Sequence, residues 1–238
     1  MYKIYLLIIL LIIFKFIDLF FIQSNIIEYY VITLKNIDRI KNIKRQEENI
    51  NININIFEAI KGVLINQEEL INNNILDPIF KYPTIKRSNE IGCYMSHLTL
   101  LKKIKNNNIN QSNYSVILED DFEIINSDFQ MIINDALLQI PDNFDILFLG
   151  YPVIIDESTN LNYSTNLYEF NNKNNIYGAY AYLINNNNID KIVENIEYID
   201  MPIDIKYQEL GYKSKLNIFF INPKIIDTNL GFASTIVV

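Results

Sequence analysis

The sequence predicts an α/β domain with a largely parallel sheet. Short apolar runs rich in β-branched and aromatic residues alternate with segments whose apolar residues recur every three to four positions. Such alternation of strands and helices is typical of a parallel sheet covered by helices. The chain has 238 residues, is 50% hydrophobic and 20% charged, and contains only 6 Pro. This composition suits one folded domain of about 200 residues and a short appendage.

The strands and helices can be placed in order along the chain. Six strands are expected in apolar segments bounded by polar turn residues: Tyr29–Leu34, Ile54–Phe57, Tyr114–Leu118, Phe144–Leu149, Gly178–Ile184 and Leu216–Ile221. Five helices are expected from the spacing of apolar residues: Ile37–Glu48, Glu90–Lys105, Asp128–Gln139, Asn188–Ile196 and Ile203–Leu210. Glu90–Lys105 is the most regular of these helices, because its apolar residues form one continuous face. Asn-rich runs between the elements are expected to be loops.

The N-terminal segment differs from the rest of the chain. Residues Ile4–Ile22 are apolar except for one tyrosine, Lys15 and Asp18, and about 20 apolar residues suffice to cross a bilayer. Lys15 and Asp18 would share a helix face, where their charges can neutralise each other. We therefore expect a membrane anchor in residues 1–25 and one domain in residues 26–238. A buried core helix is the alternative interpretation of the apolar segment.

The charges beside this segment predict its orientation. Lys3 and the amino terminus precede the segment, and Glu28 is the first charged residue after it. The positive-inside rule therefore places the N-terminus in the cytosol and the domain in a lumen.

Composition excludes several classes of protein. The net charge of −8 argues against a nucleic-acid binder, which carries a basic surface. Cys93 is the only cysteine, which excludes an intrachain disulfide and a metal cluster made of cysteines. The chain lacks a phosphate-binding G-x-x-x-x-G-K-[ST] loop, so phosphoryl or nucleotidyl transfer is the least favoured function.

Three consecutive acidic residues, Glu119, Asp120 and Asp121, directly follow the expected strand Tyr114–Leu118. In an α/β sheet, ligands bind beyond the carboxyl ends of the strands. If the strand geometry continues, Glu119 and Asp121 point in one direction and Asp120 in the other. Such carboxylates suit Mn²⁺ or Mg²⁺, which would bridge the protein to a substrate diphosphate. A solvated acidic turn is the alternative interpretation.

Three further polar residues have open roles. His97, the only histidine, shares a helix face with Glu90 and Cys93 beside the apolar face, which favours a packed structural role. Asp200 and Asp204 flank a proline at an expected helix start. Helix capping and catalysis are both compatible with these two aspartates.

Several short motifs follow one another along the chain. Asn89–His97 reads N-E-I-G-C-Y-M-S-H, Val116–Asp121 reads V-I-L-E-D-D, and Phe57–Gly62 reads F-E-A-I-K-G. The further segments in this order are Val31–Arg39, Phe144–Gly150, Tyr177–Leu183, Pro202–Asp204 and Ser234–Ile236. Together these segments resemble glycosyltransferase family 25, the family of lipopolysaccharide glycosyltransferases and collagen galactosyltransferases, over about residues 28–236.

This resemblance implies a single GT-A-like, Rossmann-like domain with a mostly parallel mixed sheet. It also implies inverting transfer of galactose or glucose from a UDP-sugar, with Mn²⁺ or Mg²⁺ as the cofactor. Glu119 and Asp121 are then the expected metal ligands, with Asp120 near the ribose or the sugar. Asp204 is the expected general base and Asp200 the second choice. The remaining expected donor-site residues are Thr33, Lys35, Arg39, Glu90, Ser96 and His97.

Two hypotheses about function follow from the sequence. The first is a membrane-anchored, metal-dependent hexosyltransferase that acts on a glycan, a lipid-linked acceptor or a protein. The second is a catalytically inactive glycosyltransferase-like protein that binds at a membrane or surface. The second hypothesis arises because Asn89 stands where the family usually has Gly, and because the loops are rich in Asn.

Overall fold

The computed structural model describes residues 26–80, 87–107, 112–152, 167–171, 177–229 and 231–232. Its centre is a seven-stranded sheet with the strand order β2-β1-β3-β7-β5-β8-β6. The strands of this sheet are β1 (Ile27–Thr33), β2 (Ile54–Glu58), β3 (Tyr114–Glu119), β5 (Ile146–Gly150), β6 (Leu167–Glu169), β7 (Ala181–Asn185) and β8 (Ile218–Ile221). Strands β4 (Phe122–Ile124) and β9 (Ile226–Thr228) pair separately as an antiparallel ribbon.

The sheet is mixed, with most strands running in one direction. β1 pairs in parallel with β2 and β3, and β5 pairs in parallel with β8. β7 lies antiparallel between β3 and β5, and β6 lies antiparallel to β8. The strands β1, β2, β3, β5 and β8 therefore share one direction, which confirms the expected Rossmann-like sheet.

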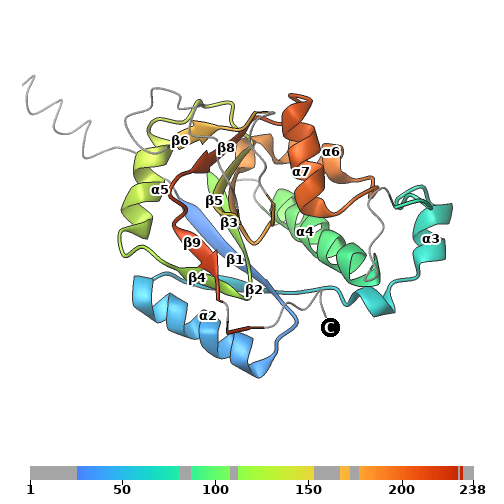
Figure 1. Cartoon of the computed structure of the whole chain (residues 1–238), viewed down its shortest axis with the longest axis horizontal. Helices are drawn as coiled ribbons and strands as arrows, with labels where there is room; N and C mark the ends of the chain where they lie inside the picture. The colour runs from blue at the N-terminus through green and yellow to red at the C-terminus, as the bar shows by residue number, and fades with distance from the viewer. Residues whose placement is uncertain are drawn as a thin grey trace, which may run out of the picture.

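Helices cover both faces of the sheet (Figure 1). On one side lie α2 (Ile37–Ile50) and α5 (Phe129–Leu137), and on the other lie α4 (Arg87–Asn107), α6 (Ile189–Ile196) and α7 (Ile203–Tyr212). The short helix α3 (Gln67–Asn72) and the 3-10 turns η1 (Gly62–Leu64) and η3 (Asn186–Asn188) complete the described elements.

The apolar runs form central strands because both of their faces are buried. In β3, Val116 and Leu118 join the core on the side of α2 and α5, whereas Ile117 joins the core on the side of α4. All three side chains are fully buried. A strand buried on both faces has a continuous apolar sequence and not an alternating one, as the sequence shows here.

All six expected strands and all five expected helices are confirmed, with their ends shifted by a few residues. The elements that the sequence did not predict are α3, β4, β6, β9 and the 3-10 turns η1 and η3. They are too short for a periodic pattern of apolar residues to develop.

The expected anchor, Ile4–Ile22, lies outside the described residues. Within the part of the chain that the structure describes, no helix combines the length and the apolar character needed to cross a membrane.

A close approach between two backbones positions the start of α4. A Cβ atom on Gly92 would lie 2.7 Å from the Gly62 nitrogen and 2.8 Å from the Ile60 oxygen. Ser96 reinforces this contact, because its Oγ accepts a hydrogen bond from the Ile60 N–H (2.8 Å) and donates one to the Gly92 oxygen (2.7 Å). The segment after β2 is thereby held against one face of α4.

The substitution Gly92→Ala is expected to destabilise the protein. Replacing a mid-helix glycine with alanine usually stabilises a helix by about 0.5–1 kcal/mol, but overpacking against backbone atoms costs about 1–3 kcal/mol. The free energy of unfolding in denaturant measures the net effect. Asn106→Ala, at an exposed position on the same helix, should change stability by less than about 0.5 kcal/mol. A Gly92→Ala variant as stable as the wild type would show that the contact does not restrain α4.

Candidate active site

Two adjoining cavities lie beyond the carboxyl ends of β1, β2 and β3. The smaller has a volume of about 280 Å³ and the larger about 440 Å³, and Cys93 and Glu119 line both of them. The polar residues of the smaller cavity are Thr33, Lys61, Asn89, Ser96, His97 and Asp120. Those of the larger cavity are Glu90, Asp121, Tyr180, Asp204, Thr228 and Asn229.

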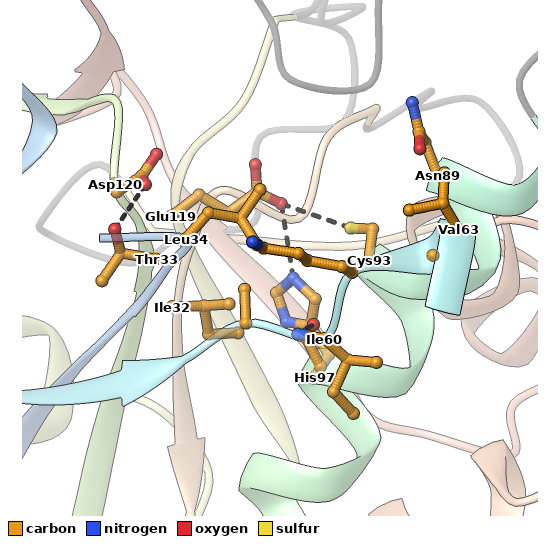
Figure 2. A pocket seen from close by; sticks show the side chains of 14 residues that line it. Ile32, Thr33, Leu34, Ile60, Val63, Asn89, Cys93, His97, Glu119 and Asp120 are labelled. Atoms are coloured by element: carbon orange, nitrogen blue, oxygen red, sulfur yellow. Dashed lines mark hydrogen bonds and ion pairs between the residues drawn. The ribbon is translucent and has the colours of Figure 1, made fainter. Parts of the chain in front are cut away.

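The acidic triplet distributes its side chains between the two cavities. Asp120 lines the smaller cavity and Asp121 the larger, while Glu119 stands at the boundary. β3 ends at Glu119, and Asp120 and Asp121 lie in a turn, so the alternating directions expected from a continued strand do not apply to them. In Figure 2, Asp120 meets Thr33, whose Oγ1 donates a hydrogen bond of 2.6 Å to Asp120 Oδ2.

Arg39 reaches the acidic triplet from α2. Its Nη1 lies 3.4 Å from Asp120 Oδ1 and 3.3 Å from Asp121 Oδ2, and its side chain is only 6% exposed. The guanidinium also lies over the Phe232 ring, 4.4 Å from its centroid. Arg39, which we expected to contact a nucleotide, thus holds two carboxylates together. Lys35, expected in the same role, forms an ion pair with Glu58 at 2.6 Å.

Asp121 has the features of a cation ligand. Its Oδ1 is buried and has no hydrogen-bond partner among the residues that the structure describes. Burial raises the pKa of Asp121 and the charge of Glu119 raises it further, whereas Arg39 opposes the rise. A cation at Oδ1 would relieve both the missing hydrogen bond and the repulsion between carboxylates. Asp121 therefore fits a hard divalent ion.

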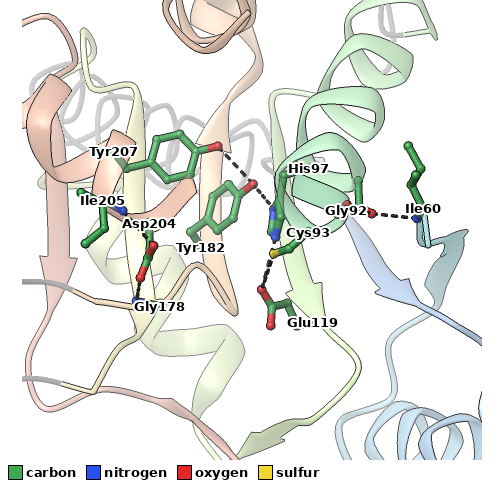
Figure 3. Close-up of polar contacts among 11 residues, drawn as sticks. Ile60, Gly92, Cys93, His97, Glu119, Gly178, Tyr182, Asp204, Ile205 and Tyr207 are labelled. Atoms are coloured by element: carbon green, nitrogen blue, oxygen red, sulfur yellow. Dashed lines mark hydrogen bonds and ion pairs between the residues drawn. The ribbon is translucent and has the colours of Figure 1, made fainter. Parts of the chain in front are cut away.

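Glu119 is held at the boundary by α4. His97 Nε2 lies 3.3 Å from Glu119 Oε1, and the Cys93 thiol donates to the same oxygen across 3.8 Å. On the other side of the ring, His97 Nδ1 lies 2.9 Å from the Tyr182 hydroxyl, which accepts a hydrogen bond from Tyr207 (Figure 3). His97 is buried, as expected for the packed structural role that the sequence favours. The structure adds that this buried histidine directly contacts the site.

Asp204 faces the larger cavity from the first turn of α7. The Gly178 N–H donates to its Oδ2 and the Ile205 N–H donates to its Oδ1, each at 2.9 Å. Gly178 has a φ of 80°, a conformation that glycine adopts without strain. Asp200 instead forms an ion pair with Lys206 at 2.8 Å and is not among the lining residues of either cavity.

The two cavities are strongly acidic. Their carboxylates are Glu90, Glu119, Asp120, Asp121 and Asp204. Burial raises the pKa of Glu90, and the charges of Asp204 and Glu119 add to the rise. Arg39 and Lys61 are the basic side chains placed beside these carboxylates. The excess of negative charge favours the binding of a further cation.

Some residues of the site could not be assigned from the sequence. Cys93 lies on the boundary between the cavities, although a cysteine within a helix usually acts as a small apolar residue. Tyr180 lines the larger cavity with a buried hydroxyl that no described residue pairs. Tyr180 lies within the motif segment Tyr177–Leu183, which is the signal that could have identified it.

Comparisons with known proteins support the family resemblance. A family model described as glycosyltransferase family 25 (LPS biosynthesis protein) matches residues 26–206. Procollagen galactosyltransferase 1-B of Xenopus laevis is 30% identical over 131 residues, which make up 52% of this chain and 21% of that protein. The chain thus matches about a fifth of the length of this curated relative.

A comparison with solved structures gives a distant match. It is the 4-diphosphocytidyl-2C-methyl-D-erythritol synthase from Anaerococcus prevotii DSM 20548, with a TM-score of 0.40 and 11% identity. The match covers 86% of this chain and 93% of that chain.

Proposed function

Because the chain belongs to glycosyltransferase family 25, we propose that it is an inverting hexosyltransferase with UDP-galactose or UDP-glucose as the donor. The observation that carries this proposal is the arrangement of Asp121 and Asp204 in one cavity. A carboxylate suited to a cation and a carboxylate suited to proton transfer face the same 440 Å³ space. Both functions accelerate the displacement of a diphosphate by a hydroxyl group.

The residues that line the two cavities suggest which part of the donor each cavity would bind. The smaller cavity combines apolar residues such as Ile32 and Val63 with polar Thr33 and Asp120, which suits a nucleoside. The larger cavity would take the sugar and the acceptor hydroxyl. Glu119 lines both cavities, so the diphosphate would cross between them beside this residue.

Mn²⁺ or Mg²⁺ would be held at this crossing by Asp121 and Glu119. The support for this assignment is the unpaired Oδ1 of Asp121 and the surplus of carboxylates. When bound, the cation acts as a Lewis acid that stabilises the negative charge on the departing diphosphate. Arg39 pairs with Asp121 through Oδ2, which leaves Oδ1 as the oxygen that would bind the cation.

Asp204 is the proposed general base. Its carboxylate would accept the proton of the acceptor hydroxyl as that oxygen bonds to the anomeric carbon of the sugar. The bond from this carbon to the diphosphate breaks, and its electron pair leaves with UDP. The two backbone N–H groups that bind Asp204 fix the direction of its carboxylate, which is the positioning that such a transfer needs.

The acceptor is proposed to be a glycan, a lipid-linked glycan or a protein. We further propose that Ile4–Ile22 anchors the enzyme in a membrane, with the N-terminus in the cytosol. The apolar character of this segment supports the anchor.

The experiment that tests this function is a screen of UDP-sugars for release of UDP, with and without Mn²⁺. Release from UDP-galactose or UDP-glucose is expected only when Mn²⁺ is present. The inactive alternative draws support from Arg39, which already compensates part of the charge on Asp120 and Asp121. If no UDP is released and UDP with Mn²⁺ does not raise the melting temperature, we would conclude that the chain is the catalytically inactive, glycosyltransferase-like protein.

A further inference from the structure

Cys93, His97 and Glu119 meet at the boundary between the two cavities. We infer that they form a binding site for a thiophilic divalent cation such as Zn²⁺, which shares Glu119 with the hard-cation site proposed at Asp121. This inference goes beyond the proposed transferase function and does not depend on it, because it is based on the geometry of the three side chains.

The first support is the spacing of the ligand atoms, which all lie within 4.8 Å of one another. Tetrahedral zinc with Zn–N and Zn–O bonds of about 2.0–2.1 Å and a Zn–S bond of about 2.3 Å separates N from O by about 3.3 Å and S from O by about 3.6 Å. The observed distances to Glu119 Oε1 are 3.3 Å from His97 Nε2 and 3.8 Å from Cys93 Sγ. The two distances to Glu119 are therefore close to those between ligands of one tetrahedral ion.

The second support is the length of the contact between His97 and Glu119. A charge-assisted N–H···O hydrogen bond is about 2.7–2.9 Å long, and this contact of 3.3 Å is longer. The separation is that of a weak hydrogen bond, which a cation between the two atoms could replace without moving them apart.

The third support is the partner of the other nitrogen of His97. Metal-bound histidines usually direct their second ring N–H to an oxygen atom, which fixes the tautomer and the ring orientation. His97 Nδ1 lies 2.9 Å from the hydroxyl of Tyr182, a fully buried residue. The two rings are also stacked, with centroids 5.7 Å apart. Nε2 is thereby oriented towards Cys93 and Glu119 (Figure 3).

Charge and ligand type select the ion. Burial and the charge of Glu119 raise the pKa of the Cys93 thiol, so binding of the cation would release the thiol proton to solvent. The resulting thiolate and Glu119 would together balance the charge of a divalent cation. The carboxylates of Glu90 and Asp204 line the larger cavity beside them and favour a cation further. Sulfur and imidazole ligands prefer Zn²⁺ over Mn²⁺ or Mg²⁺. Three protein ligands leave the fourth position for water or for an anionic oxygen that enters from either cavity.

Cobalt spectroscopy tests this site without a substrate. The full-length protein, freed of metal, is titrated with Co²⁺ alone and then with Zn²⁺. One equivalent of Co²⁺ should produce a thiolate-to-cobalt charge-transfer band and the strong visible absorption of tetrahedral cobalt, and Zn²⁺ should remove both. Wild-type protein that shows no charge-transfer band would overturn the inference, whatever the variants do.

Variants assign the band to these residues. Cys93→Ser should abolish the band, and Tyr182→Phe should weaken Co²⁺ binding by about 10- to 100-fold. Asp121→Asn is the matched control, because it removes a carboxylate from the larger cavity but no ligand of this site. It should leave the band unchanged. A band that persists in Cys93→Ser, or one that is lost in Asp121→Asn, would contradict the site as assigned. His97→Gln, which should also reduce binding, replaces Cys93→Ser if circular dichroism shows that the latter is unfolded.

Discussion

Asp121→Asn is expected to lower the rate of UDP release by about 100- to 1000-fold. Lewis-acid stabilisation of the departing diphosphate contributes several kcal/mol, and each 1.36 kcal/mol corresponds to about a tenfold change in rate. Asparagine preserves the shape of the side chain but removes the charge that would hold the cation. Asp121 Oδ1 has no hydrogen-bond partner among the described residues, so the structural contact that changes is the ion pair of Oδ2 with Arg39. Arg39 keeps its pairing with Asp120. Steady-state release of UDP in the presence of Mn²⁺ measures the effect.

The control for this variant is Asp190→Asn, which removes an exposed aspartate that pairs with Lys105 on the surface. Its rate of UDP release should equal that of the wild type. Asp121→Asn should keep a melting temperature close to that of the wild type, so a loss of activity would report on the site. An Asp121→Asn variant that retains wild-type activity would exclude Asp121 as the cation ligand.

Asp204→Asn is expected to reduce transfer by about 100- to 10,000-fold, the usual contribution of general base catalysis. Oδ2 and Oδ1 of Asp204 accept hydrogen bonds from Gly178 and Ile205, and an amide can keep at most part of this arrangement. The loss should appear in kcat, with little change in the KM for the donor, because the base acts in the transition state. Initial rates at several UDP-sugar concentrations separate the two parameters.

Asp200→Asn provides the comparison that assigns the base. Asp200 forms an ion pair with Lys206 and does not line either cavity, so its substitution should affect stability more than kcat. The reverse result, with kcat lost in Asp200→Asn and kept in Asp204→Asn, would transfer the role of base to Asp200.

The sequence predicted the central strands of the sheet because they are apolar and buried on both faces. Val116, Ile117 and Leu118 produce a continuous apolar run, and the helix face on α4 repeats at a regular spacing. The position of the acidic triplet at the end of β3 was predictable for the same reason. The alternation of side chains within a strand did not extend to Asp120 and Asp121, because β3 ends at Glu119 and a turn follows.

Contacts between distant segments could not be predicted from the sequence. Arg39 lies on α2, and only the packing of this helix beside the end of β3 brings it between Asp120 and Asp121. Cys93 and His97 likewise reach Glu119 because backbone contacts at Gly92 and Ser96 position α4. No local pattern in either segment encodes these distances.

The central claim is that this member of family 25 transfers a hexose from a UDP-sugar with the help of a cation at Asp121. The most direct measurement is UDP release from UDP-galactose and UDP-glucose by the wild-type protein with Mn²⁺, after addition of a chelator, and after Mn²⁺ is restored. We predict release that stops on chelation and returns with Mn²⁺. Release that continues at the same rate in excess chelator would contradict the role of the cation, and the absence of release from both sugars would contradict the donor assignment.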